Sequence, residues 1–111
     1  MQKENFYNLH ADICKTISNP RRQAIIDTIR KSEMTVSKLI KKTGISQANL
    51  SQHLTILRAK GVVRTRREGN NIYYSIANLK IIKAYDLISE VLRESISFRN
   101  KTVTDAFNHN Q

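Results

Sequence analysis

The feature that most constrains the fold is a pair of short helical patterns joined by one tight turn, over residues 35–60. Thr35 can cap the first helix, and Gly44 supplies the left-handed residue that ends it. Ser46 can cap the second helix after a gap of only two residues. Two apolar-patterned helices joined this tightly, with a glycine in the turn, predict a helix-turn-helix.

The second of these helices has an unusual outer face. Leu50, Leu54 and Leu57 repeat at i, i+4 and i+7 and define its core side. The opposite side carries small or uncharged polar residues rather than the Glu/Lys mixture that is usual on a solvated helix. The alternative explanation is that this face is nonetheless an ordinary solvated surface. Small side chains let the backbone approach base edges, and Asn or Gln presents a paired donor and acceptor to adenine in the major groove. The candidate base-reading residues, named the reading face below, are Gln47, Ala48, Asn49, Ser51, Gln52 and Thr55.

A basic hairpin follows the second helix. Two β-rich runs flank Gly69, Asn70 and Asn71, which accept the positive φ of a hairpin turn. A hairpin after a helix-turn-helix predicts a winged helix, with the wing over residues 62–76. Arginines here could form a solvated charge run, but phosphate or minor-groove contact is favoured beside a helix-turn-helix. The candidate contact residues are Arg58, Arg64, Arg66, Arg67, Asn70 and Tyr73.

The charge distribution fits a polyanionic partner. The chain has 111 residues, which suits a single domain over residues 1–111, and it has 19 Lys and Arg against 9 Asp and Glu. Residues 21–77 hold twelve of these basic residues and only three of the acidic ones. The excess positive charge therefore accompanies the reading face and the hairpin, and the predicted partner is double-stranded DNA.

Two amphipathic patterns flank this region, over residues 5–17 and 78–99. The last helix is too long and too apolar for one side of a small domain, so it and the first helix predict a homodimer seam. With a helix over 20–31 the fold is mainly α with a β-hairpin, in the order ααααββα, and residues 100–111 are a predicted flexible tail. The predicted dimer-interface residues are Phe6, Leu9, Ile13, Tyr85, Ile88 and Leu92.

Three stretches closely resemble the ArsR/SmtB family of winged-helix repressors, namely SNPRRQAIIDTI, GISQANLSQHLTILRAKGVV and RREGNNIYYSI. The resemblance covers roughly residues 9–95. It implies a homodimeric transcriptional repressor joined through its first and last helices. Each recognition helix and wing would lie on one half of an inverted-repeat operator. In this family, metals or other signals usually release the protein from DNA.

The residues that bind metal in this family are missing here. Its metal sensors carry a motif of the form Glu-Leu-Cys-Val-Cys-Asp-Leu, and this chain has EMTVSKL, Glu33 to Leu39, in the matching place. Thr35 and Ser37 replace both cysteines and Lys38 replaces the acid, so the soft ligands are gone. The last helix lacks the histidines of the family's other common metal site. We predict no metal site, no cofactor and no typical metal sensing, and the effector is unknown.

Cys14 and His53 have structural explanations that are favoured over functional ones. Cys14 is the single cysteine, and packing explains it better than a redox bridge across a dimer. His53 lies nearer the apolar side of its helix, where a hydrogen-bonded structural histidine is favoured over a base contact. The N-terminus lacks a signal-peptide core and no apolar run approaches membrane-spanning length, so a cytoplasmic protein without a membrane partner is predicted.

No enzyme is predicted, because the histidines and the cysteine are scattered and no Gly-rich phosphate loop occurs. The predicted function is a sequence-specific DNA-binding transcriptional regulator, most simply a dimeric repressor on an inverted repeat. Two alternatives stay open at this point. The chain could be a chromatin-like protein that coats DNA without sequence preference, or a winged helix used for protein interaction in a transcription complex.

Overall fold

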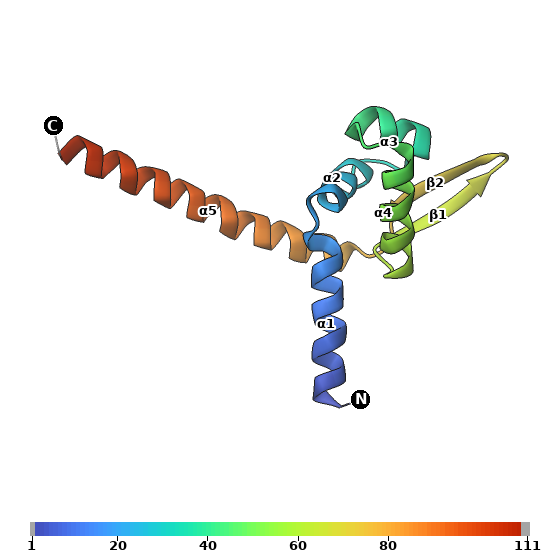
Figure 1. The fold of residues 1–111 in the computed structure, drawn as a ribbon, viewed down its shortest axis with the longest axis horizontal. Coiled ribbons are helices and arrows are strands. Elements are labelled where there is room, and N and C mark those ends of the chain that lie inside the picture. Colours follow the sequence, from blue (N-terminus) through green and yellow to red (C-terminus); the bar gives the residue numbers. More distant parts are fainter. Residues whose placement is uncertain (1, 110–111) are drawn as a thin grey trace. The chain divides into compact units, whose positions relative to one another are not determined.

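The computed structural model describes residues 2–109 of the chain, and the burial of side chains over residues 2–101. These residues form five helices and one two-stranded antiparallel hairpin, in the predicted order ααααββα (Figure 1). The mainly α fold with a winged helix-turn-helix is thereby confirmed. The elements are α1 Lys3–Ser18, α2 Pro20–Ile29, α3 Val36–Thr43, α4 Gln47–Ala59, β1 Val63–Glu68, β2 Asn71–Ile76 and α5 Leu79–His109.

Side-chain caps fix where the central helices begin. The Asn19 side chain accepts two backbone N–H hydrogen bonds from the first turn of α2, at 3.0 and 3.2 Å. Thr35 and Ser46 cap α3 and α4 in the same way. Gly44 ends α3 in the left-handed conformation, with a φ of 73°. The tight turn of the helix-turn-helix therefore forms as the sequence predicts.

One apolar core joins α2, α3 and α4 to the base of the hairpin. Full burial of a Leu or Ile side chain contributes about 1.5–3 kcal/mol, so these contacts fix how α4 is rotated about its own axis. The side chains that are at most 2% exposed in this core are Ile25, Ile26, Ile29, Leu39, Leu50, Leu54, Leu57, Val62 and Val63.

The hairpin turn is tighter than the sequence required. Strands β1 and β2 pair so that Glu68 lies opposite Asn71, which leaves two residues in the turn. Gly69, Asn70 and Asn71 can each accept a positive φ, but of these only Gly69 adopts it, with a φ of 60°. A positive φ at the first turn residue alone is what a type II′ hairpin requires, so the two asparagines keep ordinary backbone conformations.

A third backbone segment joins the hairpin near its base. The Met34 N–H donates to the Tyr74 carbonyl at 3.0 Å, and the Tyr74 N–H donates to the Met34 carbonyl at 2.8 Å. Residue 34 belongs to the link between α2 and α3, so this link runs beside β2 and ties the wing to the helices.

The described chain forms two compact units that divide after Asn78. The first contains α1 to β2, and the second contains α5. Helix α5 continues to His109, beyond the end predicted at residue 99. The flexibility of the tail over residues 100–111 stays a prediction, and residues 110 and 111 lie outside the described residues. The polar, aperiodic sequence there marks the end of an apolar face rather than of the helix, because residues 79–109 contain no Gly or Pro. The prediction of a single domain over residues 1–111 stays a prediction.

Among the described helices, α5 included, we find none that is both long and apolar enough to cross a membrane.

Candidate nucleic-acid interface

The reading face of α4 points away from the core, as predicted. All six of its residues are exposed, whereas the three leucines on the other side of the helix are at most 1% exposed. Within the described residues, the side-chain amides of Gln47 and Gln52 have no hydrogen-bond partner. Their donors and acceptors are therefore available to an outside group such as a base edge.

Thr55 contributes differently from the other residues of the reading face. Its hydroxyl donates to the Ser51 carbonyl at 2.8 Å, so Thr55 meets a partner as an acceptor or through its methyl group. Ser51, Gln52, Thr55 and Ile56 line an open hollow on the outer side of α4. The small side chains there leave room for a base edge to approach the helix.

A polar network behind the reading face ties α4 to α1 and α2. The half-buried guanidinium of Arg22 donates from Nε to His53 Nδ1 and from Nη1 to the Thr16 carbonyl, each at 3.3 Å. His53 is thus the hydrogen-bonded structural histidine that was predicted. Burial lowers the pKa of His53, and the positive charges of Arg22 and Arg21 lower this pKa further. The neutral ring is the form that can accept a hydrogen bond at Nδ1.

Exposed cationic and polar groups are spread over the wing and the end of α4. Arg64 and Arg67 are exposed on β1, and Arg67 Nε donates to the Gly69 carbonyl at 3.3 Å. Asn70 is exposed in the turn, and Arg58 is exposed in the last turn of α4. Their positions suit phosphate contact, which stays a prediction for each of them.

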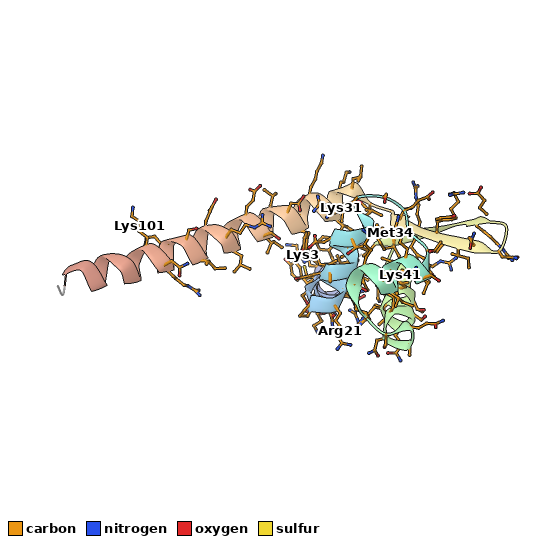
Figure 2. All side chains as sticks on the ribbon, turned by 90° about the horizontal axis from the view of Figure 1, so that it is seen from above. Lys3, Arg21, Lys31, Met34, Lys41 and Lys101 are labelled. Carbon is orange, nitrogen blue, oxygen red and sulfur yellow. The ribbon has the colours of Figure 1, made fainter. Side chains whose placement is uncertain are left out.

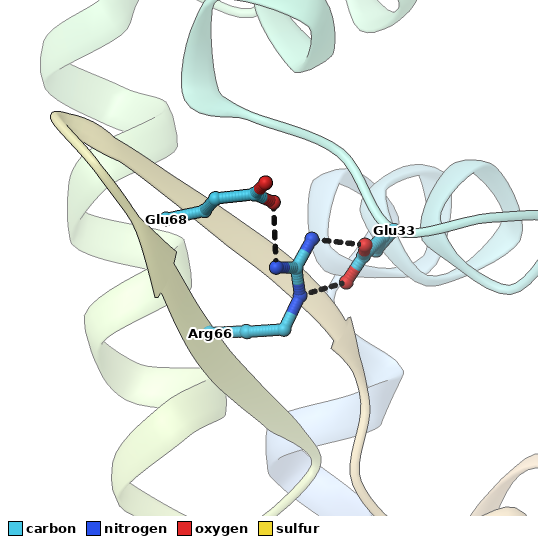
Figure 3. A network of polar contacts seen from close by, with 3 residues as sticks. All are labelled: Glu33, Arg66 and Glu68. Carbon is cyan, nitrogen blue, oxygen red and sulfur yellow. Dashed lines mark hydrogen bonds and ion pairs between the residues drawn. The ribbon is translucent and has the colours of Figure 1, made fainter.

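Arg66 is held by the protein itself (Figure 3). Its Nε donates to Glu33 Oε2 at 3.2 Å, its Nη2 to Glu33 Oε1 at 2.6 Å, and its Nη1 to Glu68 Oε2 at 2.8 Å. The guanidinium also lies over the Tyr73 ring, 4.7 Å from the ring centre. A phosphate contact by Arg66 stays a prediction, and it would require a DNA phosphate to displace one of these carboxylates.

The same contacts shift the titration of both partners. The hydrogen bonds from Arg66 lower the pKa of Glu33. Burial opposes this shift, and the charges of Arg66 and Arg64 add to it, so the pKa stays below its ordinary value. The hydrogen bonds to Glu33 and Glu68 raise the pKa of Arg66 above its already high ordinary value. Both groups therefore stay ionised at neutral pH.

Two residues at this surface lay outside the predicted set. Arg21, at the start of α2, lines an open hollow together with Gly44 and Asn49, and its side chain is exposed (Figure 2). The sequence marks Glu33 only as part of the segment that matches the family's metal motif. It is one of just three acidic residues in the basic segment 21–77, and Glu68 is another. That scarcity was the available hint that both carboxylates have a specific partner.

Several of the predicted dimer residues expose apolar side chains to water in the single chain. Phe6, Leu9, Ile88 and Leu92 are exposed, with exposed fractions of 54% to 63%, whereas Ile13 and Tyr85 are half-buried. Exposed apolar surface of this kind marks contact sites. The assignment of these six residues to a dimer interface stays a prediction.

Candidate metal ligands do not gather in the part of the chain that the structure describes. No group of three or more His, Cys, Asp or Glu side chains there could hold a metal ion. Cys14 was predicted to pack, but it is exposed, with its Sγ 3.6 Å from His10 Nδ1. The prediction failed because the buried residues of α1 are confined to its C-terminal end, at Thr16 and Ile17.

Comparison with known proteins supports the same assignment as the geometry. Residues 19–65 match the sequence profile of bacterial regulatory proteins of the arsR family. The nodulation protein NolR from Rhizobium meliloti is 38% identical over 90 residues, which cover 81% of this chain and 74% of NolR.

Two solved structures share the fold. A homodimeric winged helix-turn-helix DNA-binding domain from Mycobacterium bovis is 30% identical, with a TM-score of 0.77 over 84% of this chain and 86% of that one. The transcriptional repressor BigR from Xylella fastidiosa is 32% identical, with a TM-score of 0.70 over 82% and 96% of the two chains. The profile match, the relative and the shared fold agree that this chain belongs to the arsR family of bacterial regulatory proteins.

Proposed function

We propose that this chain is a homodimeric repressor that binds an inverted-repeat DNA operator with sequence specificity, in the cytoplasm. The observation that carries the proposal is the exposed, uncharged reading face of α4 next to a basic wing. The face offers hydrogen-bonding groups for bases, and the wing offers charge for phosphates. The protein acts by binding and release of DNA, not by catalysis.

Two relatives support the repressor and the dimer. BigR is described as a transcriptional repressor, and the domain from Mycobacterium bovis is described as homodimeric. In this chain the exposed apolar residues of α1 and α5 are the surface we assign to the second copy. Two-fold symmetry then places one reading face on each half of the operator, with half-site centres about one helical turn apart.

The proposal also excludes release by the family's usual metals. Thr35 caps α3, and Ser37 and Lys38 are exposed, so the segment in place of the cysteine motif forms a helix start. We expect zinc, cadmium and arsenite to change operator affinity by less than about threefold. DNA titrations with and without each metal measure this. A tenfold loss would reveal a site, and Cys14 with His10 would be examined first.

The decisive experiment compares specific with random DNA. Genomic fragments bound by the protein are sequenced, and a duplex carrying the shared motif competes with a random duplex at fixed salt. A regulator should prefer the motif by at least about 1,000-fold. Equal affinity for both duplexes would favour a chromatin-like protein. No affinity for either would favour a protein-interaction module.

A further inference from the structure

The outer half of the wing has little to hold it in place. None of the side chains of residues 66–73 is buried. The backbone hydrogen bonds of this segment run between its own two strands. Among the described residues, the pair between Arg66 and Glu33 is the polar contact that joins this segment to the rest of the chain.

That contact has the geometry of a rigid tether. Two nitrogens of one planar guanidinium, Nε and Nη2, meet the two oxygens of the Glu33 carboxylate, and the Tyr73 ring supports the guanidinium from one side. Glu33 directly precedes Met34, whose backbone is bonded to Tyr74 on β2. The carboxylate is therefore carried by backbone that is itself fixed to the base of the wing.

Simple electrostatics does not account for acidic groups at this position. A surface that faces DNA gains affinity from each positive charge and loses it from each negative one. Glu33 and Glu68 both offset Arg66, yet they differ in what they connect. Glu68 lies two residues away on the same strand, whereas Glu33 lies on the link between α2 and α3.

We propose that Glu33 is a positioning residue for the wing: its carboxylate holds Arg66, and through it residues 66–73, at the angle where Arg67 and Asn70 meet the DNA backbone. Glu68 accepts one hydrogen bond from the guanidinium, but it lies on the same strand as Arg66 and so joins no second element. The inference deepens the proposed function and rests on it for the role in DNA binding. The tether itself can be observed in the free protein.

The experiment compares two substitutions that remove the same charge. Glu33→Gln and Glu68→Gln each neutralise one carboxylate on Arg66, so charge alone would make both variants bind DNA more tightly. Positioning by Glu33 instead predicts that the two substitutions change DNA affinity in opposite directions. Glu33→Gln should weaken binding to the specific duplex by about 3- to 10-fold, because a mobile wing must be ordered on binding. Glu68→Gln should bind at least as tightly as the unchanged protein.

A third variant, Arg66→Gln, and the double variant with Glu33→Gln complete a cycle. If both groups act as one tether, the double variant should bind no more weakly than Arg66→Gln alone. The slope of log K against log salt should stay unchanged in Arg66→Gln. A slope lower by about 0.9 would show that Arg66 itself neutralises a phosphate, and it would overturn the proposal.

The free protein provides a readout that needs no DNA. The Arg66 Nε–H donates to Glu33 alone, so its NMR signal should be protected from solvent exchange in the unchanged protein and in Glu68→Gln, and lost in Glu33→Gln. The Tyr74 amide, bonded to Met34, should stay protected in all three and reports that the fold is intact. An exchange-labile Arg66 Nε–H in the unchanged protein, or equal effects of the two glutamine variants on DNA affinity, would refute the tether. Failure of the unchanged protein to prefer any duplex would instead refute the proposed function.

Discussion

Helix α4 and the wing belong to the same compact unit, but different forces hold them there. Helix α4 buries three leucines against α2, α3 and β1, at a gain of about 1.5–3 kcal/mol for each. Along the hairpin from residue 64 to residue 76, no side chain is buried. Beyond its buried base at Val62 and Val63, the wing depends on backbone pairing and on exposed charged groups such as Arg66.

This difference bears on how the two regions can serve DNA binding. A helix fixed by its core presents base-reading side chains in one orientation, as hydrogen-bond discrimination between bases requires. A wing held by polar groups keeps some freedom and suits contacts to phosphate, which tolerate small displacements. We therefore expect substitutions in α4 to change preference between sequences, and substitutions in the wing to change affinity for any duplex.

The largest effect should come from splitting the dimer, because a monomer brings only one α4 and one wing to the operator. Leu92→Glu places a charge in the predicted seam on α5, and we expect a monomer that binds the operator about 100-fold more weakly, because the two half-sites are no longer engaged together. Light scattering at micromolar concentration and a DNA titration measure this. Ser97→Glu is the control, since it adds the same charge five residues further along α5, about 140° around the helix axis from Leu92. An unchanged dimer in Leu92→Glu would place the interface elsewhere.

The next largest effect tests α4 alone. Gln52→Ala should cost about 1–3 kcal/mol on the specific duplex and little on random DNA, with the salt slope unchanged, if the Gln52 amide contacts a base. Competition between the two duplexes at several salt concentrations gives both quantities. Thermal unfolding of the variant is the control, because Gln52 is exposed and should not contribute to stability. Equal losses on both duplexes would make the reading face a spacer against the DNA backbone.

A smaller and less selective effect is expected from the wing. Arg67→Ala should weaken specific and random DNA alike, by about fivefold at about 0.15 M salt, and lower the slope of log K against log salt by about 0.9. Lys101→Ala removes the same charge from α5 and serves as the matched control. A change in the ratio of specific to random affinity would instead show that Arg67 reads groove width or a base.

The sequence was sufficient for the parts of the site that depend on local chemistry. The caps at Thr35 and Ser46, the left-handed Gly44 and the leucine spacing of α4 each follow from neighbouring residues, and the structure confirms the predicted helix-turn-helix. The residues of the reading face are exposed, as the leucine spacing implies, and their contact with bases stays a prediction. The pairs of Arg66 with Glu33 and Arg22 with His53 join residues more than 30 positions apart. Such contacts depend on how the elements pack, and no local pattern specifies them.

The smallest predicted effect concerns the hydrogen bond between Arg22 and His53, which joins α2 to α4. Arg22 Nε donates to His53 Nδ1, which must keep its lone pair, so protonation of His53 would break the bond and place two positive charges side by side. The pKa of His53 in the folded chain is lowered from its ordinary value of 6.5. As the pH falls below about 6.5, the unfolded chain takes up this proton before the folded chain does. The contribution of neutral His53 to the free energy of unfolding is therefore fully present above that pH, and it declines as the pH falls toward the pKa of the folded chain.

The variant His53→Asn tests whether the hydrogen bond to Arg22 or the leucine core orients α4. The Asn carbonyl oxygen can accept from Arg22 without titrating, so urea unfolding between pH 7.5 and 5.5 should show a shallower decline in the variant than in the unchanged protein. Because the leucines rather than the Arg22–His53 hydrogen bond orient α4, the ratio of specific to random DNA affinity should be the same in both proteins. If that ratio collapsed in His53→Asn while the fold and the dimer stayed intact, α4 would depend on polar contacts as the wing does, and the contrast between the two regions would fail.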